Sequence, residues 1–401
     1  MTAVLLAFAI TLLIAILISG FANRTILSTT VLFLVAGFLL GHGMLSVITL
    51  QPGDPAVSTL SEIALFTVLF TDGQLIGIKD LRGAYRLPGR ALLFGMPLTF
   101  GVSAVLGVFV ASLSWPEAFL VAAVLAPTDP VFASAIVGRV EIPYRLRHLL
   151  SVESGFNDGL ALPVVLILIA SSGGPTVDLP TLIIDLAAGI GIGVGVPVAV
   201  RLLAALPFFG ATKLYTVLAP VATGLLVFGV TAATGANPYL AAFSAGITIA
   251  SVAPEARDAF REFGEIISEL VKLFAILIFG ALITPTILAD VPISGYLFAV
   301  LLLIVARPIG VELALLRSEL GWQERLTASW FGPKGFASVL YGLLVLESGA
   351  VHSAALFHLI VIAIAVSIVA HSSTDVPIAA AFSRMEKELP ATTKPQRIDS
   401  A

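Results

Sequence analysis

The chain has 401 residues, of which 58% are hydrophobic and 11% are charged, and its formal net charge is −4. A water-soluble domain carries about 25% charged residues, so this composition excludes an ordinary soluble protein and indicates a chain that folds in lipid. The sequence contains no cysteine, which excludes disulfide bonds and thiolate metal sites.

Apolar segments of 15 to 24 residues follow one another along the sequence and lack the alternation typical of β-barrel strands. A helix needs about 20 apolar residues to cross a bilayer, and it satisfies its own backbone hydrogen bonds in lipid. We therefore predict an all-α polytopic membrane protein with thirteen transmembrane helices. In chain order they span residues 3–19, 25–41, 57–71, 91–112, 116–138, 148–170, 179–200, 214–234, 236–253, 264–285, 293–316, 326–347 and 353–372.

The two ends of the sequence set the limits of the predicted membrane domain. The first apolar segment has no basic residue before it and no small-residue cleavage site after it, so we expect a transmembrane helix rather than a secretory signal. Residues 1–383 are predicted to form one transmembrane domain. Residues 384–401 are polar and are expected to form a short cytoplasmic tail.

The basic residues define an orientation. Three of the 21 Lys and Arg residues lie inside predicted helices, which leaves 18 outside them. All of these lie in odd-numbered loops or in the tail, whereas the even-numbered loops contain only acidic charges. Cytoplasmic loops are the ones enriched in Lys and Arg. We therefore predict a bacterial-type inner-membrane protein with its N-terminus outside and its C-terminus in the cytoplasm.

Thirteen helices permit two inverted six-helix repeats, helices 1–6 and 8–13, around a linker helix. Secondary transporters often contain such repeats, with interrupted helices at matching positions. Predicted helix 5 is interrupted at Pro127-Thr128-Asp129-Pro130, and predicted helix 12 at Gly332-Pro333-Lys334-Gly335. These are the fifth helices of the two halves, so the pattern favours a transporter. The alternative is coincidence, because Gly and Pro are common in membrane helices.

Polar residues inside the apolar segments gather near the first interruption. Asp129 lies between two prolines, which predicts an unwound backbone that lines a cavity; the alternative is a kink with Asp129 as a helix cap. Glu153 and Asn157 are four residues apart and share a helix face. Ser154 and Asp158 repeat this spacing. Oxygen ligands suit hard cations, and a carboxylate in a half-dry cavity binds a proton and a cation in competition. The alternative is that these acids are interfacial.

Basic residues inside the predicted helices need partners if they are buried. For Arg307 the candidate counter-ion is Glu153, and the alternative is snorkelling to the interface. Lys334 lies at the second interruption and is expected to balance the negative C-terminal ends of half-helices. Lys272 lies near a helix end and Asp72 just past one, so both are expected to be interfacial.

The first interruption, followed by Glu153-Ser154-Gly155-Phe156-Asn157-Asp158-Gly159, resembles the cation:proton antiporter superfamily. The Asn-Asp pair is similar to the NhaP-type sodium/proton exchanger branch, and the resemblance covers about residues 60 to 370. It implies an NhaA-like antiporter fold and a homodimer of thirteen-helix protomers. Each protomer would contain a rigid dimerisation domain and a core domain that moves like an elevator.

The same resemblance implies roles for individual residues. Asp158 would carry the transported ion or the proton, with Ser154 and the backbone of Thr128 beside it. Asn157 would support the site. Relatives have Gly-x-Arg-Gly at the second interruption, whereas this chain has Lys334 there. Lysine keeps the charge but lacks the fork geometry of arginine, which leaves ion preference open.

The predicted function is secondary active antiport of cytoplasmic Na⁺ or Li⁺ against external H⁺, with a role in pH homeostasis, no cofactor and no nucleic-acid partner. Exchange by Asp158 alone is electroneutral, because Asn157 does not titrate; Asp129 remains a possible second carboxylate. A K⁺/H⁺ antiporter shares every motif. A Na⁺-coupled symporter is a further alternative. A membrane-embedded enzyme is disfavoured because the helices contain no His-Glu-x-x-His pair and no Ser/Lys or Ser/His dyad.

Overall fold

The computed structural model describes residues 2–22, 28–75, 87–129, 142–172, 179–209 and 212–388, and it contains no strand within these ranges. Eight of the described helices are long and apolar enough to cross a membrane. Four further apolar helices of 10–17 residues accompany them. The chain is therefore a multi-pass helical membrane protein. The count of thirteen helices and the inverted repeats remain predictions.

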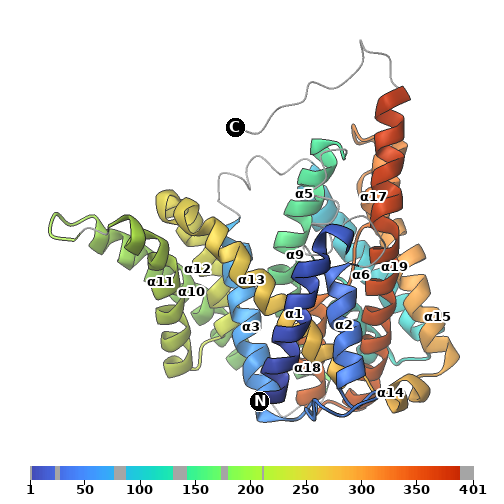
Figure 1. Ribbon diagram of the computed structural model, residues 1–401. Coiled ribbons are helices and arrows are strands. Elements are labelled where there is room, and N and C mark those ends of the chain that lie inside the picture. Colours follow the sequence, from blue (N-terminus) through green and yellow to red (C-terminus); the bar gives the residue numbers. More distant parts are fainter. Residues whose placement is uncertain are drawn as a thin grey trace.

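One group of helices packs together at the left and front of Figure 1. Its members are α1 (Thr2–Ala22), α2 (Thr29–Leu40), α3 (Pro55–Gln74), α10 (Leu179–Ala204), α11 (Lys213–Thr234), α12 (Pro238–Val252) and α13 (Pro254–Leu282). Glycines allow two of the crossings. Gly37 of α2 meets Gly280 of α13, and Gly73 of α3 meets Gly246 of α12, so that backbones touch where any side chain would collide.

The remaining helices form a second group. They are α5 (Leu87–Arg90), α6 (Met96–Phe109), α7 (Trp115–Leu125), α9 (Tyr144–Ser171), α14 (Pro285–Asp290), α15 (Ile293–Leu301), α16 (Arg307–Ala314), α17 (Trp322–Trp330), α18 (Phe336–Glu347) and α19 (Ser353–Glu388). The two groups meet where α3, α12 and α13 pack against α9 and α18. The predicted site residues lie on the second group, close to this contact.

Two π-helical turns occur at related places in the second group. The turn η1 (Ala91–Gly95) precedes α6, and η2 (Leu302–Ala306) precedes α16. In each, the residue just before a proline donates its backbone N–H to the carbonyl five residues back: Met96 to Ala91 and Arg307 to Leu302. They fall in the predicted fourth helix of each half. This agreement supports the repeat hypothesis.

The described helices depart from the predicted bounds at several ends. Predicted helix 3 was placed at 57–71 but runs to Gln74, and helix 13 was placed at 353–372 but continues to Glu388, past the predicted start of the tail. Hydropathy alone does not detect polar helical turns, so it predicts helix ends that are too short. Residues 130–138 of predicted helix 5 and 389–401 of the tail lie outside the described residues.

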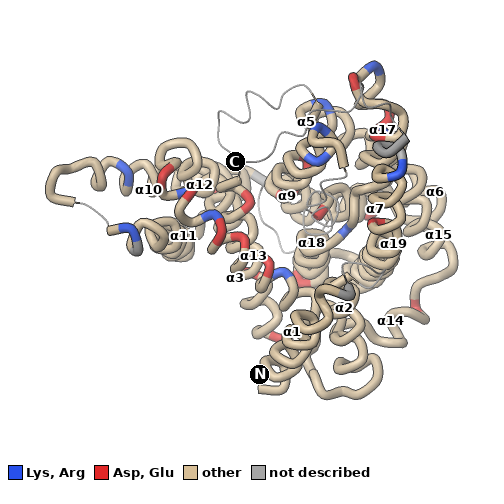
Figure 2. Tube along the Cα trace, turned by 45° about the horizontal axis from the view of Figure 1, so that its top comes forward, with Lys and Arg blue, Asp and Glu red and all other residues tan. Residues whose placement is uncertain are grey.

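The described basic residues agree with the predicted asymmetry. In Figure 2 most Lys and Arg segments lie toward the end of the bundle that carries α5, α17 and the α10–α11 ends. Several basic residues that carried the prediction lie outside the described part of the chain: Arg24, Lys79, Arg82, Arg86, Arg139, Lys394 and Arg397. The orientation in the membrane therefore stays a prediction.

Candidate functional site

Two breaks in the helices meet in the second group. Helix α7 ends at Leu125, and the backbone is non-helical from there to Asp129. Helix α17 ends at Trp330, and α18 begins six positions later at Phe336. The two unwound stretches touch directly, because the backbone N–H of Asp129 donates to the carbonyl of Pro333 at 2.9 Å. The Pro and Gly residues of both motifs explain why the helices stop here.

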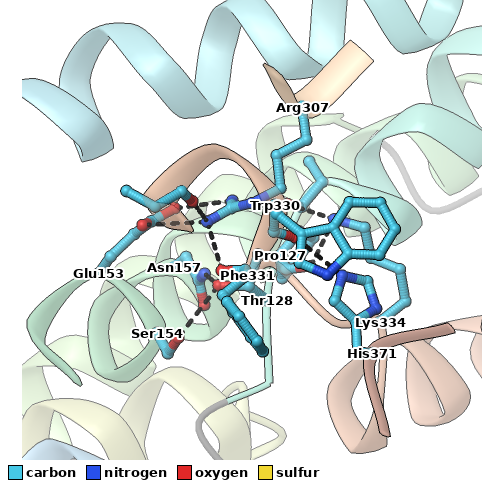
Figure 3. Close-up of polar contacts among 12 residues, drawn as sticks. Pro127, Thr128, Glu153, Ser154, Asn157, Arg307, Trp330, Phe331, Lys334 and His371 are labelled. Carbon is cyan, nitrogen blue, oxygen red and sulfur yellow. Dashed lines mark hydrogen bonds and ion pairs between the residues drawn. The ribbon is translucent and has the colours of Figure 1, made fainter. Parts of the chain in front are cut away.

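Charged side chains lie at the helix ends exposed by these breaks. Asp129 accepts a hydrogen bond from the backbone N–H of Phe336, at the positive N-terminus of α18. Lys334 donates to the carbonyls of Ala126 and Pro127, at 3.3 and 3.2 Å, just past the negative C-terminus of α7. Figure 3 shows Lys334 directed toward Pro127. Both placements match the sign of the helix dipole.

The polar face of α9 lies against the first break. Thr128 receives a hydrogen bond from the amide of Asn157 at 2.6 Å, and its hydroxyl lies 3.1 Å from that of Ser154. Figure 3 shows these three side chains converging from α9 and the unwound segment. All three are at least 98% buried. The three-residue spacing of Ser154 and Asn157 on α9 thus brings a hydroxyl and an amide to one point in the interior.

Asp158, the residue after Asn157 on α9, has a carboxylate oxygen that accepts no hydrogen bond within the described residues. Its side chain is buried, and its Oδ1 atom has no hydrogen-bond partner within the described residues. The Oδ1 atom of Asn157 is in the same situation. A buried acceptor without a partner costs about 1–3 kcal/mol. The Tyr341 hydroxyl donates to the backbone carbonyl of Asp158 at 2.7 Å and leaves the carboxylate itself available.

Glu153 and Arg307 form a buried ion pair beside this site. Arg307 donates to both carboxylate oxygens of Glu153, at 2.9 and 3.2 Å. It also donates to the carbonyls of Ala328 and Phe331, at 3.2 and 2.9 Å, at the C-terminal end of α17. Figure 3 shows the guanidinium between Glu153 and this helix end. Arg307 is 3% exposed and does not snorkel to an interface.

Two charged residues were misjudged from the sequence. Asp72 of α3 and Lys272 of α13 were expected to be interfacial, but both are buried, and their charged atoms lie 3.6 Å apart. The expectation failed because α3 and α13 are longer than hydropathy indicated, which moves both residues inward. One signal was available. Glu265, Glu269 and Lys272 share one face of α13 at four- and three-residue spacing.

A cavity of about 640 Å³ leads to this second ion pair. It lies between α3, α13 and Ser151 near the start of α9. Its lining on α13 changes with depth, from exposed Arg261 and Glu265 to buried Ser268 and Lys272. The cavity therefore connects the predicted cytoplasmic side with the contact between the two helix groups.

Replacing Gly335 with alanine is expected to destabilise the protein. A methyl group there would collide with the Asp129 carboxylate that holds the N-terminus of α18. Such overpacking costs about 1–3 kcal/mol. Gly229→Ala in α11 is the matched control, because a methyl group at that position meets nothing within 4 Å. Thermal melting of the purified variants should show a lower midpoint for Gly335→Ala alone; equal midpoints would contradict the packing argument.

Comparison with known proteins agrees with this arrangement. The sodium/hydrogen exchanger transmembrane family matches residues 9–381. A protein of Shewanella oneidensis named K⁺/H⁺ antiporter NhaP2 is 23% identical over 374 residues, which is 90% of this chain and 64% of that protein. A protein of Alkalimonas amylolytica named K⁺/H⁺ antiporter NhaP is 25% identical over 94% of this chain and 66% of its own length. The chain thus spans just under two thirds of these curated relatives.

The fold is also similar to that of a solved structure. The sodium/proton antiporter MjNhaP1 from Methanocaldococcus jannaschii superposes with a TM-score of 0.78 at 20% identity, over 95% of this chain and 97% of that one. The family match over residues 9–381 includes both helix breaks and the polar face of α9. The chain therefore belongs to the sodium/hydrogen exchanger family of the cation:proton antiporter superfamily.

Proposed function

We propose that the protein is a secondary active antiporter that exchanges a cytoplasmic monovalent cation, Na⁺ or Li⁺, for an external proton. The observation that carries this proposal is the buried Asp158 carboxylate beside two helix breaks, whose Oδ1 atom has no hydrogen-bond partner within the described part of the chain. A buried ionised carboxylate without a counter-charge is costly. Asp158 therefore binds either a proton or a metal cation, and the two ligands exclude each other.

The surrounding groups supply the remaining ligands. We assign the Ser154 hydroxyl and the backbone carbonyl of Thr128 as neutral oxygen ligands, which suit a hard cation. Asn157 holds Thr128 in place by its hydrogen bond. Both oxygens of Glu153 accept hydrogen bonds from Arg307. Glu153 therefore supports the site structurally and is not a direct ligand in this proposal.

In this proposal, alternating access arises because one helix group moves against the other. The site lies on the second group, whereas α3, α12 and α13 of the first group pack against it. Sliding of one group along the other carries Asp158 from the cytoplasmic cavity to the outer side. In this proposal the first group also forms the homodimer contact in the inner membrane, the N-terminus is outside and the tail is cytoplasmic.

The charge count predicts electroneutral exchange. Asp158 is neutral with either one proton or one monovalent cation bound, so both loaded states carry the same charge. The rate of Na⁺-driven proton movement in proteoliposomes should therefore not respond to an imposed membrane potential. A clear dependence on the potential would assign a second titrating carboxylate to the cycle, for which Asp129 is the candidate.

The identity of the cation is the open alternative. The two curated relatives described above are named K⁺/H⁺ antiporters, and the solved relative is named a sodium/proton antiporter. The family resemblance implies an arginine at the position of Lys334, so we propose that this lysine bears on selectivity. Antiport in everted membrane vesicles, with Na⁺, Li⁺ and K⁺ added in turn to dissipate ΔpH, tests the proposal. A proton signal without any organic solute excludes the symporter alternative, and the absence of a signal with all three ions contradicts antiport.

A further inference from the structure

Two ion pairs are buried among the described residues, and they differ in how tightly they are held. In the Arg307–Glu153 pair both carboxylate oxygens and two helix carbonyls are hydrogen-bonded to the guanidinium. In the Lys272–Asp72 pair the charged atoms are 3.6 Å apart, which exceeds the length of a hydrogen bond. The Arg307–Glu153 pair is therefore fixed by hydrogen bonds, whereas the Lys272–Asp72 pair is held less tightly. We call the Lys272–Asp72 pair the loose pair.

Buried oxygen atoms without hydrogen-bond partners among the described residues belong to the same cavity as the loose pair. The Oδ2 atom of Asp72, the Oε1 atom of Gln74 and the Oγ atom of Ser268 are buried without a hydrogen-bond partner within the described residues. All three residues and Lys272 line the inner part of the 640 Å³ cavity. Buried oxygen atoms without donors attract a cation. The only cation that the described structure provides next to Asp72 is the ammonium group of Lys272.

The loose pair also lies on the path to the proposed carrier. The cavity opens among charged residues of α13 and ends at Asp72 and Lys272. The helices that carry the pair pack against the second group beside Asp158, since α3 contacts α9 and α13 contacts α18. A cation that approaches Asp158 from the cytoplasm therefore meets a site that already holds a positive charge.

We propose that Lys272 is a tethered competitor of the transported cation. Its ammonium group neutralises Asp72 when the path is empty, and an incoming cation displaces it from Asp72 before reaching Asp158. The competition weakens cation binding and speeds release. Lys272 thereby sets the cation affinity of the antiporter as a positioning residue, without binding the ion itself. This inference rests on the function proposed above.

Neutralising Lys272 tests the inference. Lys272→Gln keeps a hydrogen-bond donor for Asp72 but removes the charge, so KM for the cation should fall by about tenfold at alkaline pH, where proton competition is weak. The turnover number should fall as well, because release becomes slower. Lys272→Arg retains the charge and should keep KM within about twofold of the wild type. Transport by Lys272→Gln with an unchanged or raised KM overturns the inference.

The wild-type protein provides a second test that does not depend on a variant folding. Reductive methylation with formaldehyde, followed by mass spectrometry, reports how accessible each lysine is. The cation that the wild type transports fastest should increase methylation of Lys272, because the displaced ammonium loses Asp72. Lys213, which is exposed at the start of α11, is the control and should not respond. Unchanged or reduced methylation of Lys272 overturns the inference.

The outcomes separate this inference from the proposed function. If wild-type vesicles show no cation/proton exchange, the proposed function fails and the role of Lys272 fails with it. If the wild type exchanges ions and Asp158→Asn does not, while Lys272→Gln keeps the wild-type KM, the competitor role alone fails.

Discussion

Replacing Asp158 with asparagine is expected to reduce cation-driven dissipation of ΔpH in everted vesicles to the level of vesicles without the protein. Asparagine has nearly the same shape but neither releases a proton nor carries the charge that neutralises a cation. The buried site keeps its geometry, since the Tyr341 hydroxyl bonds the backbone of residue 158 and not its side chain. Loss of transport would therefore reflect loss of the carrier and not of the fold.

The matched control for this variant is Asp185→Asn. Asp185 lies on α10 in the first helix group and is partly exposed. This substitution also replaces a carboxylate by an amide, but at a position outside the proposed ion path to Asp158. Asp185→Asn should transport at the wild-type rate. Wild-type transport by Asp158→Asn would refute the assignment of the carrier.

Replacing Arg307 with glutamine is expected to cause the largest loss of stability. The change leaves the buried Glu153 carboxylate without its counter-ion. It also removes the hydrogen-bond donors to the carbonyls of Ala328 and Phe331. Removing one partner of a buried pair costs about 3–5 kcal/mol. Thermal melting of the purified protein in detergent should show a much lower midpoint or no folded protein.

Two further variants test the cause of that loss. Glu153→Gln combined with Arg307→Gln removes both buried charges, so the double variant should be more stable than Arg307→Gln alone. Arg257→Gln is the surface control. Its partner Asp258 is 61% exposed, and such pairs contribute about 0–1 kcal/mol. A double variant no more stable than the single one would assign the loss to the helix carbonyls instead.

The local features of the site were predictable from the sequence because they depend on short-range rules. Proline and glycine mark the positions where α7 ends and α18 begins. Four-residue spacing places Ser154 and Asp158 on one face of α9. Charge at a helix end follows from the dipole, which is why Asp129 and Lys334 lie at ends of opposite sign. Each of these inferences needs only a few neighbouring residues.

The features that the sequence did not reveal depend on contacts between distant helices. Asp72 and Lys272 are 200 positions apart, and only the packing of α3 on α13 brings them together. Hydropathy placed them at helix ends because polar residues lower the average and shorten the predicted helix. The same effect hid the continuation of α19 to Glu388. The buried pairing of charges is therefore the property that a single sequence reports least well.

The most direct test of the account is the number of protons that the purified protein releases when it binds its cation. In weakly buffered detergent solution, at a pH where the carrier is protonated, cation binding should release close to one proton per bound ion. Asp158→Asn should release none. Cation binding by the wild type without proton release, or undiminished proton release by the variant, would contradict competition of the two ions for Asp158.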